Sequence, residues 1–153
     1  MFIELVDNGL EGVFDVEQYC IDNNIDAEKV TSLDCSYNIL TELKSLDKLV
    51  NLDWLDCSDN KLSEIKGLDK LVNLEYLYCE YNPLSELDLS NLVNLKKLEC
   101  HNNKLTELDT SNLVNLNWLN DKEYMQPEPE QYKLDLILSK IEKLEQIILN
   151  NKR

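Results

Sequence analysis

Glycine and proline are scarce in this sequence: three of each occur among 153 residues, so long flexible linkers are not expected. No apolar run reaches 18 residues, and the opening stretch MFIELVDNGLEGVFDVEQYC carries acids where a secretion signal needs basic residues. We therefore expect neither a membrane span nor a secretory leader. The sequence also lacks a phosphate-binding P-loop and the motifs GxGxxG, HExxH and GxSxG, which are typical of large enzyme classes.

Basic residues are few as well. Fifteen Lys and Arg residues stand against 30 Asp and Glu residues, and the formal net charge is −15. This charge argues against direct binding of nucleic acid, because such binding depends on Lys and Arg replacing condensed counterions. It also disfavours association with membranes. A protein partner with a basic patch is the natural electrostatic complement, although the charge could instead serve only solubility.

Five cysteines form an odd set, and a chain of this length buries enough core to fold without disulfides. We expect reduced thiols and a cytoplasmic location. CxxC pairs are missing, so the cysteines do not predict a zinc site, and no cofactor is predicted.

Four segments align without gaps and define an internal repeat of 21 to 22 residues. They are VTSLDCSYNIL from Val30, LDWLDCSDNKL from Leu52, LEYLYCEYNPL from Leu74 and LKKLECHNNKL from Leu95. A fifth start, LNWLN from Leu116, keeps two leucines and then departs from the pattern. The array therefore ends near residue 120.

The shared pattern places leucine at position 4, cysteine at 6, asparagine at 9 and leucine at 11. It resembles the leucine-rich repeat family, and most closely its bacterial, internalin-like class. The resemblance implies one α/β domain, a solenoid with about five parallel strands on a concave face and short 3-10 or extended turns on the convex side. It further implies an N-terminal helical cap over residues 1–29, repeats over 30–119 and a C-terminal cap helix within 120–153.

Strand alternation assigns the repeat positions to two faces. Positions 4 and 6 point inward and positions 3, 5 and 7 point outward, so the cysteines at position 6 are predicted to be buried small hydrophobes. The asparagines at position 9 can bond backbone groups of the turn and of the next turn, and should form a structural ladder. The members of this ladder are Asn38, Asn60, Asn82 and Asn103. The convex turns should be held by Leu46, Leu49, Leu68, Leu71, Leu89, Leu92 and Leu113.

Catalysis is not expected. His101 is the only histidine and lies at an outward position beside inward Cys100, so the two side chains diverge and cannot act as a nucleophile and base. No pair of carboxylates is marked by its spacing for acid and base chemistry.

The outward columns favour a binding face for a protein partner. Exposed Trp and Tyr often dominate binding energy, and nothing in the folding of the repeat requires them here. The alternative is that the aromatic rings only cover one another between strands. The candidate binding residues are Trp54, Tyr76, Tyr78, Trp118, Tyr37, Tyr81, Asp34, Asp56, Glu80 and Glu99.

Two other functions remain open at this point. One is an acidic inhibitor, encoded by a phage or mobile element, that blocks the basic nucleic-acid channel of a host enzyme. The other is an accessory subunit that docks through its C-terminal helix, with a monomer favoured over a dimer. The apolar stripe of that helix consists of Leu134, Ile137, Ile141, Leu144 and Ile148.

Overall fold

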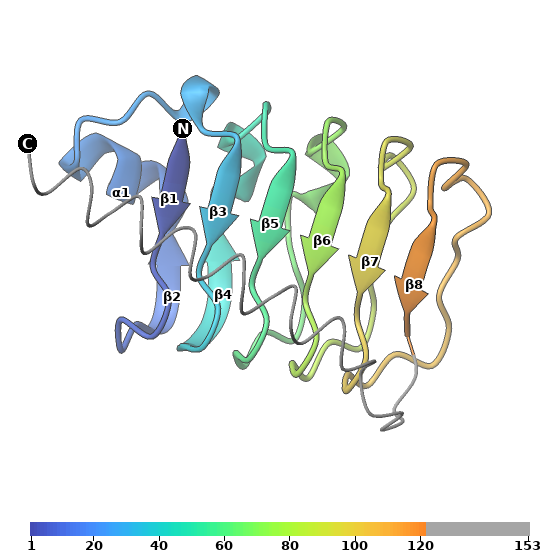
Figure 1. The fold of residues 1–153 in the computed structure, drawn as a ribbon. Helices are drawn as coiled ribbons and strands as arrows, with labels where there is room; N and C mark the ends of the chain where they lie inside the picture. Colours follow the sequence, from blue (N-terminus) through green and yellow to red (C-terminus); the bar gives the residue numbers. More distant parts are fainter. Residues whose placement is uncertain (122–153) are drawn as a thin grey trace, which may run out of the picture. The chain divides into compact units, whose positions relative to one another are not determined.

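A computed structural model describes residues 1–121 of the chain. Its main element is a parallel sheet of six strands in the order β1-β3-β5-β6-β7-β8 (Figure 1). One strand comes from each of the five predicted repeats, and the predicted leucine-rich-repeat solenoid is confirmed. These five strands are β3 (Ser32–Asp34), β5 (Trp54–Asp56), β6 (Tyr76–Tyr78), β7 (Lys97–Glu99) and β8 (Trp118–Asn120).

The strands stack in register, so equivalent repeat positions become neighbours in space. Leu33 pairs with Leu55, Leu55 with Leu77, and Leu77 with Leu98. These position-4 leucines are fully buried, as are the position-6 cysteines of the first three repeats. A residue therefore meets its counterpart from the next repeat about 4.8 Å away, and the core is a set of such columns.

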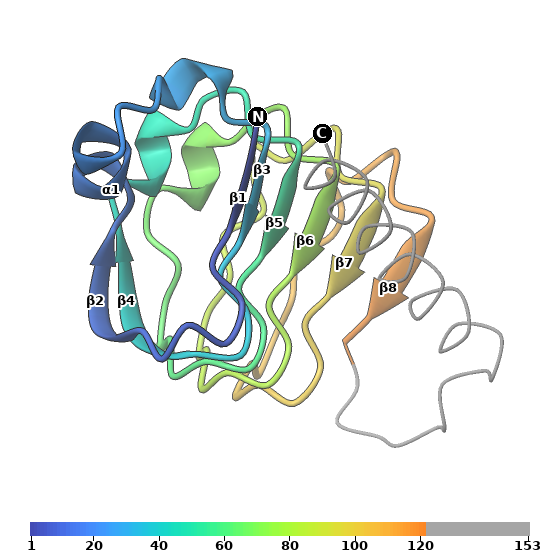
Figure 2. The same ribbon diagram turned by 60° about the vertical axis from the view of Figure 1, so that its left-hand side comes forward.

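The sixth strand was not predicted. β1 (Phe2–Glu4) pairs with β3 and extends the sheet beyond the first repeat. A second, two-stranded parallel sheet is formed by β2 (Glu11–Asp15) and β4 (Ile39–Lys44), and Figure 2 shows it on the opposite side of the solenoid from β1 and β3. The N-terminal segment thus contributes a strand to each sheet, and a purely helical cap is not confirmed.

The one α-helix of the described residues is α1 (Val16–Asp22). Asp15 begins it, because its Oδ1 atom accepts the backbone N–H groups of Glu17 at 3.1 Å and Gln18 at 3.3 Å. Val16 and Cys20 lie one helical turn apart and are buried against the core. The helix therefore covers part of the first repeat with only a narrow apolar face.

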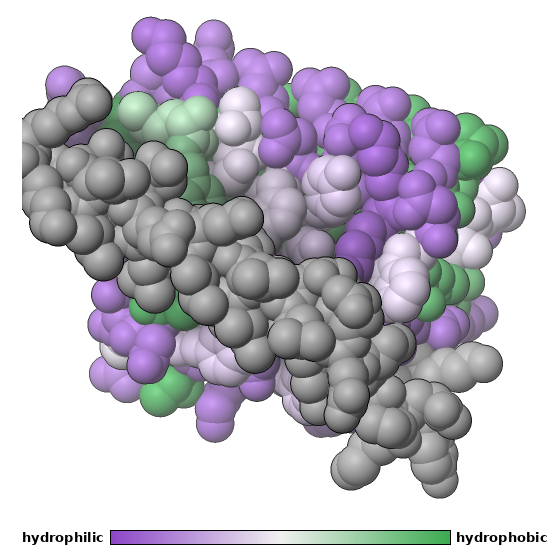
Figure 3. All heavy atoms as spheres, in the orientation of Figure 1, coloured by the Kyte–Doolittle hydropathy of each residue, from purple (hydrophilic) through white to green (hydrophobic). Residues whose placement is uncertain are grey.

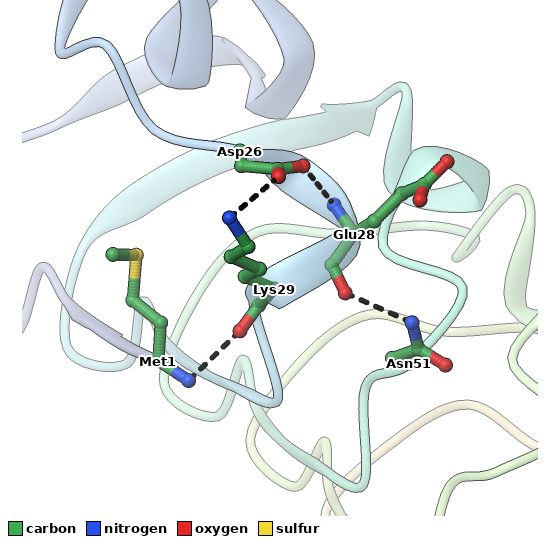
Figure 4. A network of polar contacts seen from close by, with 5 residues as sticks. All are labelled: Met1, Asp26, Glu28, Lys29 and Asn51. Atoms are coloured by element: carbon green, nitrogen blue, oxygen red, sulfur yellow. Dashed lines mark hydrogen bonds and ion pairs between the residues drawn. The ribbon is translucent and has the colours of Figure 1, made fainter.

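A polar network ties the first residue to the short 3-10 helix η1 (Ala27–Lys29) and η1 to Asn51 at the end of the first repeat (Figure 4). The Met1 amino group donates to the Lys29 carbonyl at 2.8 Å, and Asn51 Nδ2 donates to the Glu28 carbonyl at 2.8 Å. Asp26 caps η1 through the Glu28 N–H at 3.2 Å and pairs with Lys29 at 3.2 Å. These bonds fix the chain where it enters β3.

The opposite side of each repeat closes through short turns, as predicted. Two of them are the 3-10 helices η2 (Leu46–Lys48) and η3 (Leu68–Lys70), and the predicted leucines of these turns are all buried. Ser45 and Gly67 precede η2 and η3 in the left-handed conformation, with φ of 58° and 80°.

The predicted C-terminal cap helix falls on residues 122–153, outside the described residues, together with its apolar stripe. Among residues 1–121, no helix has the length and apolar character needed to cross a membrane.

Candidate functional site

The aligned cysteines form a buried structural column. Cys35 Sγ donates to the Asp56 carbonyl at 3.5 Å, Cys57 Sγ to the Tyr78 carbonyl at 3.5 Å, and Cys79 Sγ to the Glu99 carbonyl at 3.4 Å. All five cysteines are free thiols, and burial raises the pKa of Cys57 and Cys79 well above the usual value. Within residues 1–121 no cluster of three or more His, Cys, Asp or Glu side chains is arranged to hold a metal ion.

The position-9 asparagines form the predicted ladder. Asn60 Nδ2 donates to the Cys57 carbonyl of its own repeat at 3.2 Å and to the Cys35 carbonyl of the preceding repeat at 2.9 Å. Its Oδ1 accepts the Leu40 N–H at 2.9 Å. Asn38, Asn82 and Asn103 repeat this pattern. These side chains therefore provide hydrogen-bond partners for backbone N–H and carbonyl groups of the turns.

A second asparagine ladder was missed. Asn73 Nδ2 donates to the Val50 carbonyl at 3.1 Å, and Asn94 Nδ2 donates to the Val72 carbonyl at 2.9 Å. Asn51 and Asn115 make the equivalent bonds at the two ends of the array. The recurring tripeptide LVN was the signal for it, because Asn follows Val at the same place in successive repeats.

The outward side chains of the six-stranded sheet (β1, β3, β5, β6, β7 and β8), with the residues that follow each strand, form what we call the sheet face, the face predicted to be concave. Phe2 and Trp54 pack edge to face with ring centroids 6.1 Å apart, and Trp54 contacts Tyr78 at 5.6 Å. Aromatic rings from three strands therefore form one continuous surface. Phe2 belongs to it although sequence reasoning did not place it there.

Lys97 lies on the same face and is held by aromatic rings and a carboxylate. Its Nζ atom is 5.0 Å from the Tyr78 ring centroid and 5.5 Å from that of Trp118. It also pairs with Glu99 Oε1 at 3.1 Å. The sheet face thus accommodates a cation between two aromatic side chains.

Two of the candidate acids also stabilise turns. Asp34 Oδ1 accepts the N–H of Ser36 at 3.1 Å and its hydroxyl at 2.7 Å. Asp56 and Ser58 repeat these bonds at 3.0 Å and 2.6 Å. Burial is the main reason that the pKa of Asp56 rises from 3.8 to about 6.

The residues at position 8 share an unusual backbone. Tyr37, Asp59, Tyr81 and Asn102 all have left-handed φ values, between 51° and 54°. This conformation suits Asn and Asp but is uncommon for Tyr. The two tyrosines are 55% and 51% exposed, and the Tyr81 ring contacts the His101 ring edge to face at 5.1 Å.

Glu80 lies between these residues and the strand ends. Burial, together with the negative charges of Asp56, Glu99 and Asp59, raises the pKa of Glu80 from 4.5 to about 8. Glu80 Oε2 and His101 Nδ1 are buried atoms without a hydrogen-bond partner among residues 1–121. Glu80 therefore holds its proton at neutral pH more readily than an ordinary carboxyl group does.

The structure places all ten candidate residues on the sheet face, but in different environments. Tyr37, Tyr81 and Trp118 are exposed, Trp54, Tyr76, Tyr78, Asp56 and Glu80 are partly buried, and Asp34 and Glu99 are buried. Figure 3 shows hydrophilic side chains along the visible rim of this face, with residues of intermediate hydropathy between them.

Comparisons with known proteins agree with this geometry. The family model described as leucine-rich repeats in two copies matches residues 50–92. The functional domain of InlJ from Listeria monocytogenes, described as including a cysteine ladder, is similar with a TM-score of 0.54 at 34% sequence identity, covering 61% of this chain and 25% of that chain. An internalin from the same species, InlF, gives a TM-score of 0.49 at 25% sequence identity, and the match covers 64% of this chain and 36% of that chain.

No curated protein matches the chain. The chain spans about a quarter of the length of the InlJ structure and about a third of the InlF structure. The stacked 21- to 22-residue repeats, the buried cysteine column and the likeness to InlJ identify the fold of this chain as a leucine-rich-repeat solenoid similar to that of the internalins.

Proposed function

We propose that this protein is a non-enzymatic interaction module that binds a basic protein partner through its sheet face. The observation that carries the proposal is the continuous aromatic surface formed by Phe2, Trp54 and Tyr78, which lie on β1, β5 and β6 of one sheet. Leucine-rich-repeat proteins typically act as interaction modules, and the chain matches that family model and is similar to the InlJ functional domain.

The charge supports a basic partner. The formal net charge is −15, and Asp56, Asp59 and Glu80 lie close together at the ends of the strands. Complementary charge speeds the encounter of two proteins and suppresses wrong partners, whereas desolvated aromatic rings supply most of the affinity. We assign the aromatic residues to anchoring, and Asp56 and Asp59 to electrostatic selection, since Glu80 with its pKa raised to about 8 is largely uncharged at neutral pH. Asp34 and Glu99 have internal partners and are assigned to the support of the face.

A cytoplasmic location is part of the same proposal. It is supported by the five free thiols, all of which are buried.

The test is capture of a partner from a lysate of the source cell, with the double variant Trp54→Ala/Tyr76→Ala compared with the wild type. The matched control is Val50→Ala/Val93→Ala, which removes exposed apolar side chains outside the sheet face. We expect a partner that is lost with the first variant and kept with the control. Circular dichroism verifies that both variants fold.

Retention of the partner by both variants would refute binding through the sheet face. Retention combined with a steep loss of binding at high salt would favour the acidic-inhibitor alternative, because that mode depends on charge rather than on the aromatic anchors.

A further inference from the structure

Three residues that follow successive strands, Tyr37, Asp59 and Tyr81, present side chains that the buried core of the array does not use. We propose that Tyr37, Asp59 and Tyr81 form a clamp for the guanidinium group of an arginine on the basic protein partner. This inference rests on the proposed function, since it names the chemical group that the sheet face takes from that partner.

The stack sets the spacing of the clamp. The Tyr37 N–H donates to the Ser58 carbonyl at 3.1 Å, and the Asp59 N–H donates to the Glu80 carbonyl at 3.1 Å. Tyr37, Asp59 and Tyr81 therefore lie at equivalent positions of three successive repeats. At about 4.8 Å per repeat, the two tyrosine backbones lie about 10 Å apart with Asp59 midway. A planar group stacked between two rings needs about 7 Å between the ring planes, and a backbone separation of about 10 Å leaves room for that distance.

Exposure and backbone geometry indicate recognition. Tyr37 and Tyr81 expose about half of their surface, although the left-handed backbone at this position disfavours Tyr. Asn102 occupies the equivalent position of the next repeat with the same φ, so a small polar residue would serve the turn as well. The turn conformation therefore gives no reason for a tyrosine at either position, although the Tyr81 ring also packs on His101.

The charges around the clamp favour a cation. Burial raises the pKa of the Tyr37 hydroxyl, and the negative charges of Asp59, Asp56 and Glu80 raise it further, so three carboxyl groups act on one ring. Glu80 Oε2 is buried with no hydrogen-bond partner among the described residues. A guanidinium N–H is the kind of donor that this oxygen and the Asp59 carboxylate lack.

The protein holds one cation in a similar setting. Lys97 lies over Tyr78 and Trp118 and pairs with Glu99 on the same face. At the clamp the backbone of Asp59 lies between those of the two tyrosines in the stack, and a flat guanidinium could stack on a ring and still bond the carboxylate with two N–H groups. An ammonium group can contact rings and a carboxylate together, as Lys97 does, but it lacks the planar pair of N–H groups that bonds both carboxylate oxygens, so arginine is favoured over lysine.

The experiment is calorimetric titration of the full chain with capped tri-arginine and capped tri-lysine peptides at low salt. We expect tri-arginine to bind more tightly than tri-lysine. Tyr37→Asn/Tyr81→Asn should weaken tri-arginine binding about tenfold and abolish the preference over tri-lysine. This variant carries the residue that repeat four already has at the equivalent position, so the fold is retained.

Charge is controlled separately. Asp59→Asn and Glu86→Gln each remove one negative charge, but Glu86 is an exposed residue of a different turn. We expect Asp59→Asn to reduce tri-arginine affinity about fivefold and Glu86→Gln to change it less than about twofold. Equal affinity for the two peptides, or equal losses in the two charge variants, would overturn the clamp, because net charge would then explain the binding.

The clamp and the proposed function fail in different ways. Loss of partner capture with Trp54→Ala/Tyr76→Ala, combined with no arginine preference, would refute the clamp and leave binding through the sheet face intact. Retention of capture by that double variant would refute the sheet-face proposal, whatever the peptides show.

Discussion

The Trp118 indole N–H donates to the Glu99 carboxylate at 2.8 Å, across the boundary between the last two strands of the sheet. The same Oε1 atom accepts from Lys97 at 3.1 Å, so one carboxylate holds both a neutral and a charged donor. Glu99 is only 5% exposed, and these bonds balance its removal from water.

Replacement of this carboxylate should therefore weaken the end of the array. We expect Glu99→Ala to lower the free energy of unfolding by about 2 kcal/mol, since it leaves the largely buried Lys97 ammonium without its ion pair. Denaturant unfolding monitored by tryptophan fluorescence measures the loss. Lys66→Ala removes the exposed Lys66–Glu64 pair instead and should have little effect. Similar losses in the two variants would contradict the assigned role of Glu99.

The two asparagine ladders should differ in strength. Asn60→Ala leaves the buried Cys35 and Cys57 carbonyls and the Leu40 N–H without this side-chain partner, and we expect a loss of about 2 to 3 kcal/mol. Asn73→Ala removes one bond at an exposed site and should cost less than about 1 kcal/mol. Thermal unfolding followed by circular dichroism ranks them, and the reverse order would refute this reading of the ladders.

The turn before η3 depends on glycine. Gly67 has φ of 80°, and a Cβ atom there would lie 3.0 Å from the Asp47 backbone nitrogen. We expect Gly67→Ala to destabilise the fold by about 1 to 2 kcal/mol. Ser45 occupies the equivalent left-handed position before η2, so Ser45→Gly should leave the melting temperature unchanged or higher. A neutral Gly67→Ala would show that the Asp47 backbone moves away easily.

Stability should rise as the pH falls from about 8 toward 5. The pKa of Glu80 is raised from 4.5 to about 8, so the folded chain holds a proton that the unfolded chain releases over this range. The stabilisation is complete below pH 4.5 and is lost as the pH rises through 8. Asp56, raised from 3.8 to about 6, acts in the same direction at lower pH.

Glu80→Gln tests this dependence. Glutamine cannot ionise, so we expect the variant to exceed the wild type in free energy of unfolding by about 1 to 2 kcal/mol at pH 8.5 and to lose the slope above pH 7. Urea unfolding at a series of pH values provides the measurement. An unchanged slope in the variant would assign the titration to another group.

Repetition explains how much of the fold the sequence predicts. Leu33, Leu55, Leu77 and Leu98 recur at nearly the same spacing, so a strand assigned in one repeat can be checked against the others. That assignment predicts the sheet, its register and the ladder that includes Asn60. β1 and β2 lie outside the repeats, so no second copy of their sequence reveals which of their side chains point inward and which point outward. Helix α1 was expected as part of a helical cap, but the strands around it depend on pairing with the array.

The candidate site was predicted in composition but not in detail. Outward positions follow from strand alternation, so Trp54 and Tyr78 were correctly placed on the outward face. Whether a carboxylate faces solvent or accepts hydrogen bonds from its own turn depends on side-chain geometry, which the alternation does not give. The recurring Asp-x-Ser spacing was an unused signal, because Asp34 and Asp56 cap their turns through it, and Asp88 and Asp109 do the same elsewhere.

The shared backbone at position 8 separates what the protein recognises from what keeps it folded. Tyr, Asp and Asn occupy one conformation there, while the leucine, cysteine and asparagine columns carry the packing and the turn bonds. A change of side chain at this position can alter the ligand of one repeat without a compensating change in its neighbours. The solenoid can therefore acquire a new specificity in single mutational steps, each of which leaves a folded protein.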